Sequence, residues 1–86
     1  MKIWAVQNIW VVDGVVGSTI FLYSTEEEAR YYFKQAVLTD RRWDRPMIKK
    51  KLYKIEKDSN KKYRVVHSKN RAKYYNEYSI FEREVE

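Results

Sequence analysis

A capped amphipathic helix in the first half of the chain is the feature that most constrains the fold. Thr25 is a favourable N-cap residue and Glu28 stands three residues later, so the two form a capping box. The glutamates at 26–28 also suit the positive end of the helix dipole. Apolar residues then recur at helical spacing, at Ala29, Tyr32, Phe33, Ala36 and Val37. The pattern predicts a helix from about Glu26 to about Asp40, ending before Pro46.

A β-hairpin is predicted directly before this helix. Residues 2–12 are rich in β-branched and aromatic side chains, and both of their alternating faces are mainly apolar. Such a pattern is typical of a central strand, or of one covered on both sides. Asp13-Gly14 and Gly17 are turn signals, and residues 18–24 provide a returning strand. We therefore expect a hairpin whose connection has about three to five residues.

The second half of the chain is predicted to add three strands. Its expected elements are a linker at 41–46, strands at 47–57, 62–68 and 78–85, a polar turn at 58–60 and a charged loop at 68–73. The 86 residues suffice for one domain, 1–86. The order β-β-α-β-β-β predicts an α+β fold in which one helix packs on an antiparallel sheet of about five strands.

The residue content excludes several kinds of site. The chain has no cysteine, which excludes disulfides and thiolate metal sites, and its single histidine excludes a His-rich metal site. It has no Gly-rich phosphate loop. We expect no cofactor and no metal. The apolar start is interrupted by Gln7 and Asn8 and is too short to cross a bilayer, so we expect a cytoplasmic protein without a membrane partner.

The positive charge of the chain is concentrated in one block. Residues 41–73 carry fourteen Lys/Arg and three Asp/Glu, a net charge of +11, whereas 1–40 and 74–86 are net acidic at −2 and −3. A block of this kind focuses a positive field that dispersed charges do not.

Two groups of residues in this block are candidates for binding a polyanion or an acidic partner. The predicted hairpin displays lysines that can track phosphates beside tyrosines that can stack on unpaired bases. The linker combines arginines, whose planar forks bind phosphate bidentately, with a tryptophan of the kind common in binding hot spots. The predicted binding residues are Arg41, Arg42, Trp43, Arg45, Lys54, Lys61, Lys62, Tyr63 and Arg64.

The same residues also fit structural roles. Lysines on edge strands prevent aggregation, and a strand tyrosine often only packs. Trp43 would then fill the core where the helix ends, with the arginines on the helix carbonyls. Lys49, Lys50 and Lys51 are consecutive, so in a strand they would point to alternate faces. Both readings stay open at this point.

His67 is the one histidine that could act as a general acid or base, since Tyr63, Arg64, Lys69 and Arg71 surround it in the sequence. In size and charge the chain is similar to small RelE-like ribonuclease toxins, but no motif matches and the hairpin before the helix differs from the order expected there. We expect no catalytic residue and no enzyme activity.

A further candidate is a protein-binding face. One helix covers one face of a small sheet, and residues 2–12 are apolar on both faces. The other face is therefore closed by the C-terminal segment, by a second copy in a homodimer, or by a partner protein. Aromatic and apolar residues outside the main helix stripe also suit such contacts, namely Tyr31, Leu38, Tyr74, Tyr75 and Tyr78.

The run KIWAVQNIW…GSTIFLYSTEEEARYYFKQAV resembles short accessory proteins of bacteriophages and other mobile elements, over about residues 1–38. Such proteins often open with an aromatic-rich strand pair and then a helix start of the form S-T-x-E-E-A-x-x-Y/F. The resemblance implies a non-enzymatic protein that binds and inhibits a bacterial host protein or nucleoprotein complex, such as a CRISPR nuclease. The basic charge argues against mimicry of nucleic acid. The alternative is a regulatory protein that binds DNA or RNA directly, followed by a small ribonuclease.

Overall fold

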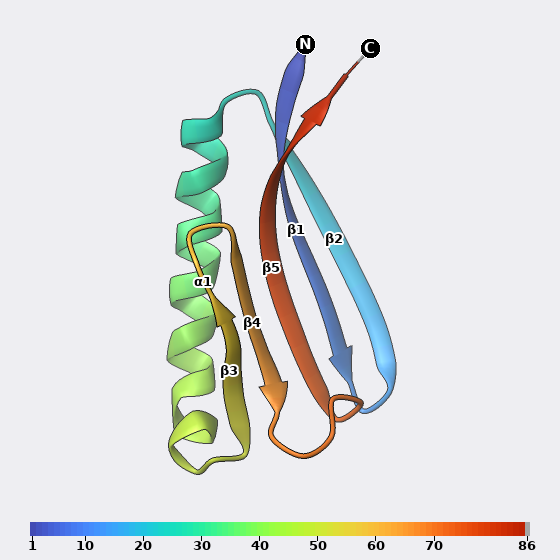
Figure 1. Ribbon diagram of the computed structural model, residues 1–86, viewed down its shortest axis with the longest axis vertical. Helices are drawn as coiled ribbons and strands as arrows, with labels where there is room; N and C mark the ends of the chain where they lie inside the picture. Colours follow the sequence, from blue (N-terminus) through green and yellow to red (C-terminus); the bar gives the residue numbers. More distant parts are fainter. Residues whose placement is uncertain (86) are drawn as a thin grey trace.

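The computed structural model describes residues 1–85, in which one helix packs on a five-stranded antiparallel sheet (Figure 1). The strands are β1 (Lys2–Val12), β2 (Val15–Tyr23), β3 (Tyr53–Asp58), β4 (Lys62–His67) and β5 (Tyr74–Glu84), and helix α1 (Glu26–Lys49) lies between β2 and β3 in the chain. Their order in the sheet is β2-β1-β5-β4-β3. The predicted α+β class and element order are confirmed.

The last strand of the chain lies in the middle of the sheet. β5 pairs with β1 over its whole length and with β4 on its other side. β1 pairs with both β2 and β5, which confirms the central position expected from its two apolar faces. The edges are therefore β2 and β3. Of the three alternatives for closing the open face, the C-terminal segment is excluded, because residues 74–84 form a strand within the sheet, as the predicted last strand implies.

The first hairpin is tighter than predicted. Its turn is Asp13-Gly14 alone, with φ angles of 49° and 80°, and β2 begins at Val15 rather than at residue 18. Two positive φ values match a type I′ turn, for which Asp-Gly is a preferred pair. Gly17 is not a turn residue. It leaves room for Trp10, since a Cβ there would lie 2.2 Å from the indole ring.

Helix α1 is longer than predicted, because it continues through Pro46 to Lys49. The expected linker at 41–46 is helical, and the strand predicted from residue 47 begins only at Tyr53. Pro46 removes one helical hydrogen bond, but Asp44 beside it is buried and accepts a hydrogen bond from Tyr74. This contact with the sheet stabilises the helix at the point where Pro46 would otherwise terminate it. β5 likewise begins at Tyr74, earlier than the predicted residue 78.

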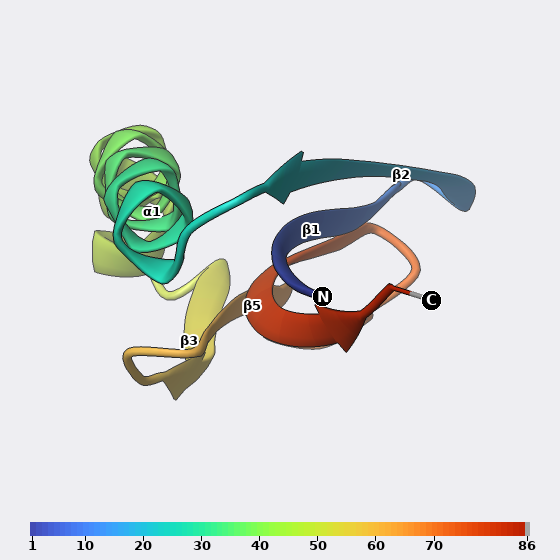
Figure 2. The same ribbon diagram turned by 90° about the horizontal axis from the view of Figure 1, so that it is seen from above.

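The hydrophobic core lies between α1 and one face of the sheet. Its members are Val6, Ala29, Phe33, Val37, Tyr63, Val65 and Ile80. The sheet is strongly curled, with α1 on one side of it (Figure 2). Within residues 1–85 no helix covers the opposite face, and there Val16, Ile20 and Leu22 are 69%, 43% and 56% exposed.

Candidate binding surface at the basic end

Two cations of the predicted hairpin site are used inside the protein. Arg64 lies between Glu56 and Glu77, at 3.2 and 3.0 Å, and Lys62 lies 3.3 Å from Glu77. Burial alone would raise the pKa of Glu77, but hydrogen bonds from Tyr75, Arg64 and Lys62 outweigh it and lower the pKa overall. Lys62 and Arg64 therefore neutralise the buried Glu77, and Arg64 also pairs with Glu56. Of this group only Lys54 and Lys61 remain exposed and without an ion pair among residues 1–85.

The tyrosines expected to stack on bases are not available for it. Tyr63 is 0% exposed and belongs to the core, with the Arg41 guanidinium 5.3 Å from its ring centroid. The ring of Tyr53 stacks on Tyr74, with centroids 4.1 Å apart. The prediction of Tyr63 as a surface contact is wrong, because its large apolar ring fills the space under the helix.

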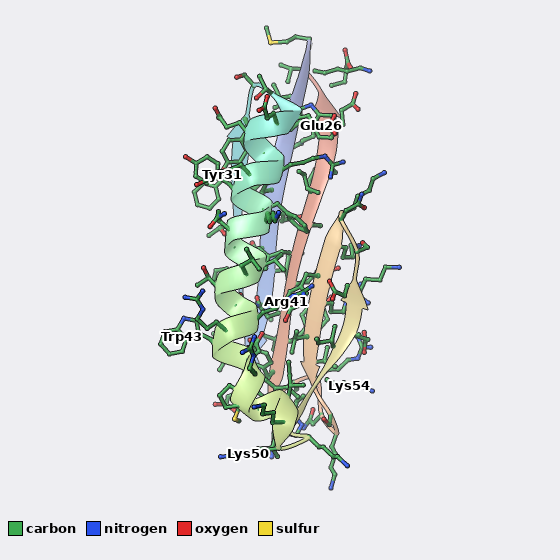
Figure 3. All side chains as sticks on the ribbon, turned by 90° about the vertical axis from the view of Figure 1, so that its left-hand side faces the viewer. Glu26, Tyr31, Arg41, Trp43, Lys50 and Lys54 are labelled. Carbon is green, nitrogen blue, oxygen red and sulfur yellow. The ribbon has the colours of Figure 1, made fainter. Side chains whose placement is uncertain are left out.

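The four residues predicted in the linker do not form one cluster. Arg41 points toward the sheet and forms an ion pair with Asp58, whereas Trp43 projects from the other side of the helix (Figure 3). Successive helical residues diverge by about 100°, so a run that looks compact in sequence is spread around the helix. Trp43 is 77% exposed, so the alternative that it fills the core is also wrong. Arg42 and Arg45 are exposed.

Helix α1 and strand β4 finish at the same end of the molecule (Figure 1), and the segments that follow them carry most of the remaining exposed cations. Two bonds join these segments: the Ser68 N–H donates to the Leu52 carbonyl at 2.8 Å, and the Ser68 hydroxyl donates to the Lys51 carbonyl at 2.7 Å. We define the basic end as the exposed residues Lys49, Lys50, Lys51, Lys54, Lys69, Arg71 and Lys73. Within residues 1–85, Arg71 alone among them has an ion pair, with Glu56.

The turn that carries three of these lysines has a well-defined geometry. The Leu52 N–H donates to the Met47 carbonyl and the Lys51 N–H to the Ile48 carbonyl, at 2.9 and 3.0 Å, which is the Schellman pattern of helix ends. Lys51 occupies the left-handed position of this motif, with φ 61°. Glycine is preferred there because a Cβ costs about 1–2 kcal/mol. A lysine is thus held in a strained conformation within the cluster.

His67 shapes the loop that carries the other cations. Its Nδ1 accepts hydrogen bonds from the Lys69 and Asn70 N–H groups, both at 3.2 Å. Its ring also meets Tyr53 edge-on, with centroids 6.3 Å apart. The sequence placed His67 near these cations, and the structure gives it a part in positioning the loop that bears Lys69 and Arg71.

A buried carboxylate under α1 was not found from the sequence. Asp44 is 4% exposed, and its Oδ1 accepts a hydrogen bond from the Tyr74 hydroxyl at 3.1 Å. Burial raises its pKa, the hydrogen bond from the Tyr74 hydroxyl opposes this increase, and neighbouring Asp40 adds a smaller one. The Asp44 Oδ2 and Tyr63 hydroxyl make no hydrogen bond within residues 1–85. In the sequence, the sign of this site is that Asp40 and Asp44 continue the helical spacing of the apolar residues Phe33 and Val37, which places both carboxylates on the face that packs on the sheet.

Two grooves run along the sides of α1. The groove toward the β3–β4 turn holds about 350 Å³ and combines Phe33 and Val37 with the cations Arg30, Lys34 and Arg41. The groove toward β2 holds about 400 Å³ and is lined by aromatic rings, among them Phe21, Tyr32 and Tyr78.

Among residues 1–85, His, Asp and Glu side chains nowhere gather in a group of three that could hold a metal ion. The helix in this range is not apolar enough to cross a membrane. Comparison of the chain with protein-family models, with curated proteins and with solved structures finds no match.

Proposed function

We propose that the protein is a non-enzymatic binding protein that engages an acidic surface of a bacterial host protein or nucleoprotein complex with its basic end. The observation that carries the proposal is the gathering of six exposed lysines, none with an ion pair among residues 1–85, on two connected segments. Internal ion pairs use Lys62 and Arg64, whereas nothing among these residues neutralises the lysines of the basic end.

The strained backbone at Lys51 supports a binding role for this cluster. Non-glycine residues held in the left-handed region are costly and cluster at binding and active sites. The loop on the other segment is fixed by the His67 hydrogen bonds, so part of the ordering entropy is lost before a partner binds.

The exposed Trp43 and Tyr31 favour a partner that contains protein. They are 77% and 59% exposed on the helix, and such aromatic residues are enriched in protein interfaces. The ring of Tyr63, by contrast, is buried, and the partly buried ring of Tyr53 stacks on Tyr74. Inhibition of the host partner is what the resemblance to mobile-element proteins implies, and it stays a prediction.

A matched pair of charge reversals tests the proposal. Lys50→Glu with Lys69→Glu alters the basic end, whereas Lys34→Glu with Lys61→Glu alters exposed lysines elsewhere; each pair lowers the net charge from +6 to +2. The measurement is capture of partner proteins from nuclease-treated bacterial lysate. We expect wild type and control to retain the same partner and the basic-end variant to lose it at least about tenfold. Equal loss from both variants, or capture that requires nucleic acid, would contradict the proposal.

Direct binding of DNA or RNA is the second candidate, because the same unpaired lysines suit phosphates. Binding to naked duplex and single strands across salt concentrations distinguishes it, since log K falls by about 0.9 per log unit of salt for each duplex phosphate neutralised. Steep salt dependence, reduced by about 2 in slope for Lys50→Glu with Lys69→Glu, would favour this candidate. Absence of binding at low salt would remove it.

A ribonuclease role has no such support. The Nδ1 of His67 accepts hydrogen bonds from two backbone N–H groups. Replacing His67 by alanine should therefore loosen the loop, and we expect no RNA cleavage by either the wild type or this variant. RNA cleavage that disappears in a His67→Ala protein with an intact fold would overturn this view.

A further inference from the structure

The two edge strands of the sheet differ sharply in how they are protected. Four of the six residues of β3 are charged, and its pairing with β4 has an irregularity between Ile55 and Lys57. Charges and bulges of this kind keep edge strands from pairing with other chains. β2 has the sequence VVGSTIFLY, without one charged residue or proline. Its apolar residues Val15, Val16, Ile20, Phe21 and Leu22 are 43–70% exposed.

The free backbone groups of β2 are set by its turn. Across a two-residue turn, the flanking residues Val12 and Val15 exchange backbone hydrogen bonds. Every second residue from Val15 then bonds to β1. The intervening residues direct their N–H and C=O groups to the free edge, and they are Val16, Ser18, Ile20 and Leu22. β2 thus offers a regular, uncharged row of unpaired donors and acceptors.

We propose that two copies of the chain pair through β2, antiparallel, to form a continuous ten-stranded sheet. The register that overlaps all of β2 places Thr19 opposite itself on the two-fold axis, Ser18 opposite Ile20, and Val16 opposite Leu22. This register makes about eight backbone hydrogen bonds, two for each hydrogen-bonded pair. The inference goes beyond the proposed function and does not depend on it, since β2 contributes no residue to the basic end.

Side chains on the helix side of β2 are complementary in this register. Phe21 of one copy lies opposite Gly17 of the other, and Phe21 is 59% exposed in the single chain. Gly17 has no side chain, and the Trp10 indole covers it. The Phe21 ring can therefore pack against the Trp10 indole, as an aromatic residue often does beside a strand glycine.

The charge distribution favours the antiparallel arrangement with a second copy. β2 starts at the end of the molecule that carries the basic residues, where the Asp13 N–H donates to the Lys73 carbonyl at 3.1 Å, and runs to the helix start, where Glu26, Glu27 and Glu28 lie (Figure 1). Antiparallel pairing places the acidic helix start of one copy at the same end as the basic end of the other. Parallel pairing would bring the two basic ends together. Antiparallel pairing thus places opposite charges at the same end of the dimer and keeps the two basic ends apart.

The first test is the oligomeric state of edge variants. Ile20 on β2 and Ile55 on β3 are both 43% exposed, so Ile20→Lys and Ile55→Lys add the same charge to the two edges. By sedimentation we expect wild type and Ile55→Lys near twice the 10.6 kDa of one chain. The dimer dissociation constant of Ile20→Lys should be at least about tenfold higher than that of the wild type, while its circular dichroism spectrum stays unchanged. Ser18→Pro, which removes an outward N–H, should act likewise.

The second test reports the register. The chain has no cysteine, so Thr19→Cys and Ser18→Cys each introduce a single thiol. Residues facing each other in a non-hydrogen-bonded antiparallel pair have Cα atoms about 4.5 Å apart, within the range for a disulfide. Oxidation should link Thr19→Cys into a covalent dimer and leave Ser18→Cys largely unlinked.

Three outcomes would overturn the proposal. A wild-type chain that is monomeric at all concentrations would exclude pairing of two copies through β2, and the free edge could then pair only with a strand of another protein. A dimer that survives Ile20→Lys and Ser18→Pro would use another surface. Equal linkage of the two cysteine variants would exclude the register centred on Thr19.

Discussion

At the scale of single residues, Lys51 has a backbone conformation that glycine would adopt with less strain. It occupies the left-handed position of the helix end, with φ 61°, whereas Lys50 before it has φ −79° in the right-handed region. Asp13 also has a positive φ, but a type I′ turn accommodates aspartate well. Of the two non-glycine residues with positive φ among residues 1–85, only Lys51 is of a type that rarely adopts this conformation.

Replacing Lys51 by glycine should stabilise the protein. Glycine removes the strain of a Cβ in the left-handed region, and the expected gain is about 0.5–1 kcal/mol after the extra flexibility of the unfolded chain is subtracted. The measurement is urea unfolding at neutral pH. Lys50→Gly is the matched control, since it removes the same charge from a right-handed position and should destabilise by a similar amount. A loss of stability in Lys51→Gly would show that the lysine itself holds the turn.

At the scale of elements, helix α1 depends on a buried polar layer in its second half. Asp40 accepts a hydrogen bond from Asn76 at 2.6 Å, and Asp44 accepts one from Tyr74 at 3.1 Å. Asn8 extends the layer by donating to Asn76 at 2.7 Å. These bonds cross from helix to sheet, so they hold the helix in register over the strands through and beyond Pro46.

Asp44→Asn should change the pH dependence of stability. The pKa of Asp44 is raised in the folded chain above its ordinary value of 3.8. Between these two pKa values the folded chain keeps a proton that the unfolded chain releases, so its stability falls as pH rises. Asparagine does not titrate, keeps an acceptor for Tyr74 and adds a donor for the unpartnered Tyr63 hydroxyl.

The expected result is a higher unfolding free energy for Asp44→Asn than for wild type at pH 7, and a difference that shrinks as pH falls toward 4. Urea unfolding at several pH values measures it. Asp13→Asn is the control, because an exposed Asn-Gly turn serves as well as Asp-Gly and should stay within about 0.5 kcal/mol. A less stable Asp44→Asn at pH 7 would mean that the carboxylate is held in its charged form.

At the scale of the whole molecule, the chain closes its fold with its last strand. β5 lies between β1 and β4, and the molecule is elongated, at 44 × 23 × 15 Å. Without β5, the β2–β1 and β4–β3 pairs would share no strand and would be joined only through the helix. The two halves of the sheet therefore become one sheet only when the C-terminal segment is present.

Truncation should show this dependence. A chain that ends at Lys73 lacks β5 and should lose its cooperative thermal transition, because both central pairings and the core residue Ile80 are gone. A chain that ends at Arg83 keeps most of β5 and should unfold cooperatively, within a few degrees of wild type. Circular dichroism on heating is the measurement. A folded chain ending at Lys73 would contradict the central role of β5.

Local chemistry in the sequence determined part of the fold and part of the site. The helix start follows from the N-cap Thr25, whose hydroxyl accepts a hydrogen bond from the Glu28 N–H, and the hairpin follows from Asp13-Gly14, since both causes span only a few residues. The apolar character of both faces of residues 2–12 was enough to predict a central strand, or one covered on both sides. The charge count also located the basic block, because charge needs no structure to be counted.

Tertiary structure decided the rest, because its causes join residues far apart in the chain. The helix passes Pro46 since Asp44 meets Tyr74, thirty residues away. Lys62 and Arg64 leave the candidate site because Glu77 comes beside them in the sheet. Lys51 and Lys69 join because Ser68 bonds the helix end. Pattern in the sequence placed the charges, but only the pairing of distant strands determined which of them remain free to bind.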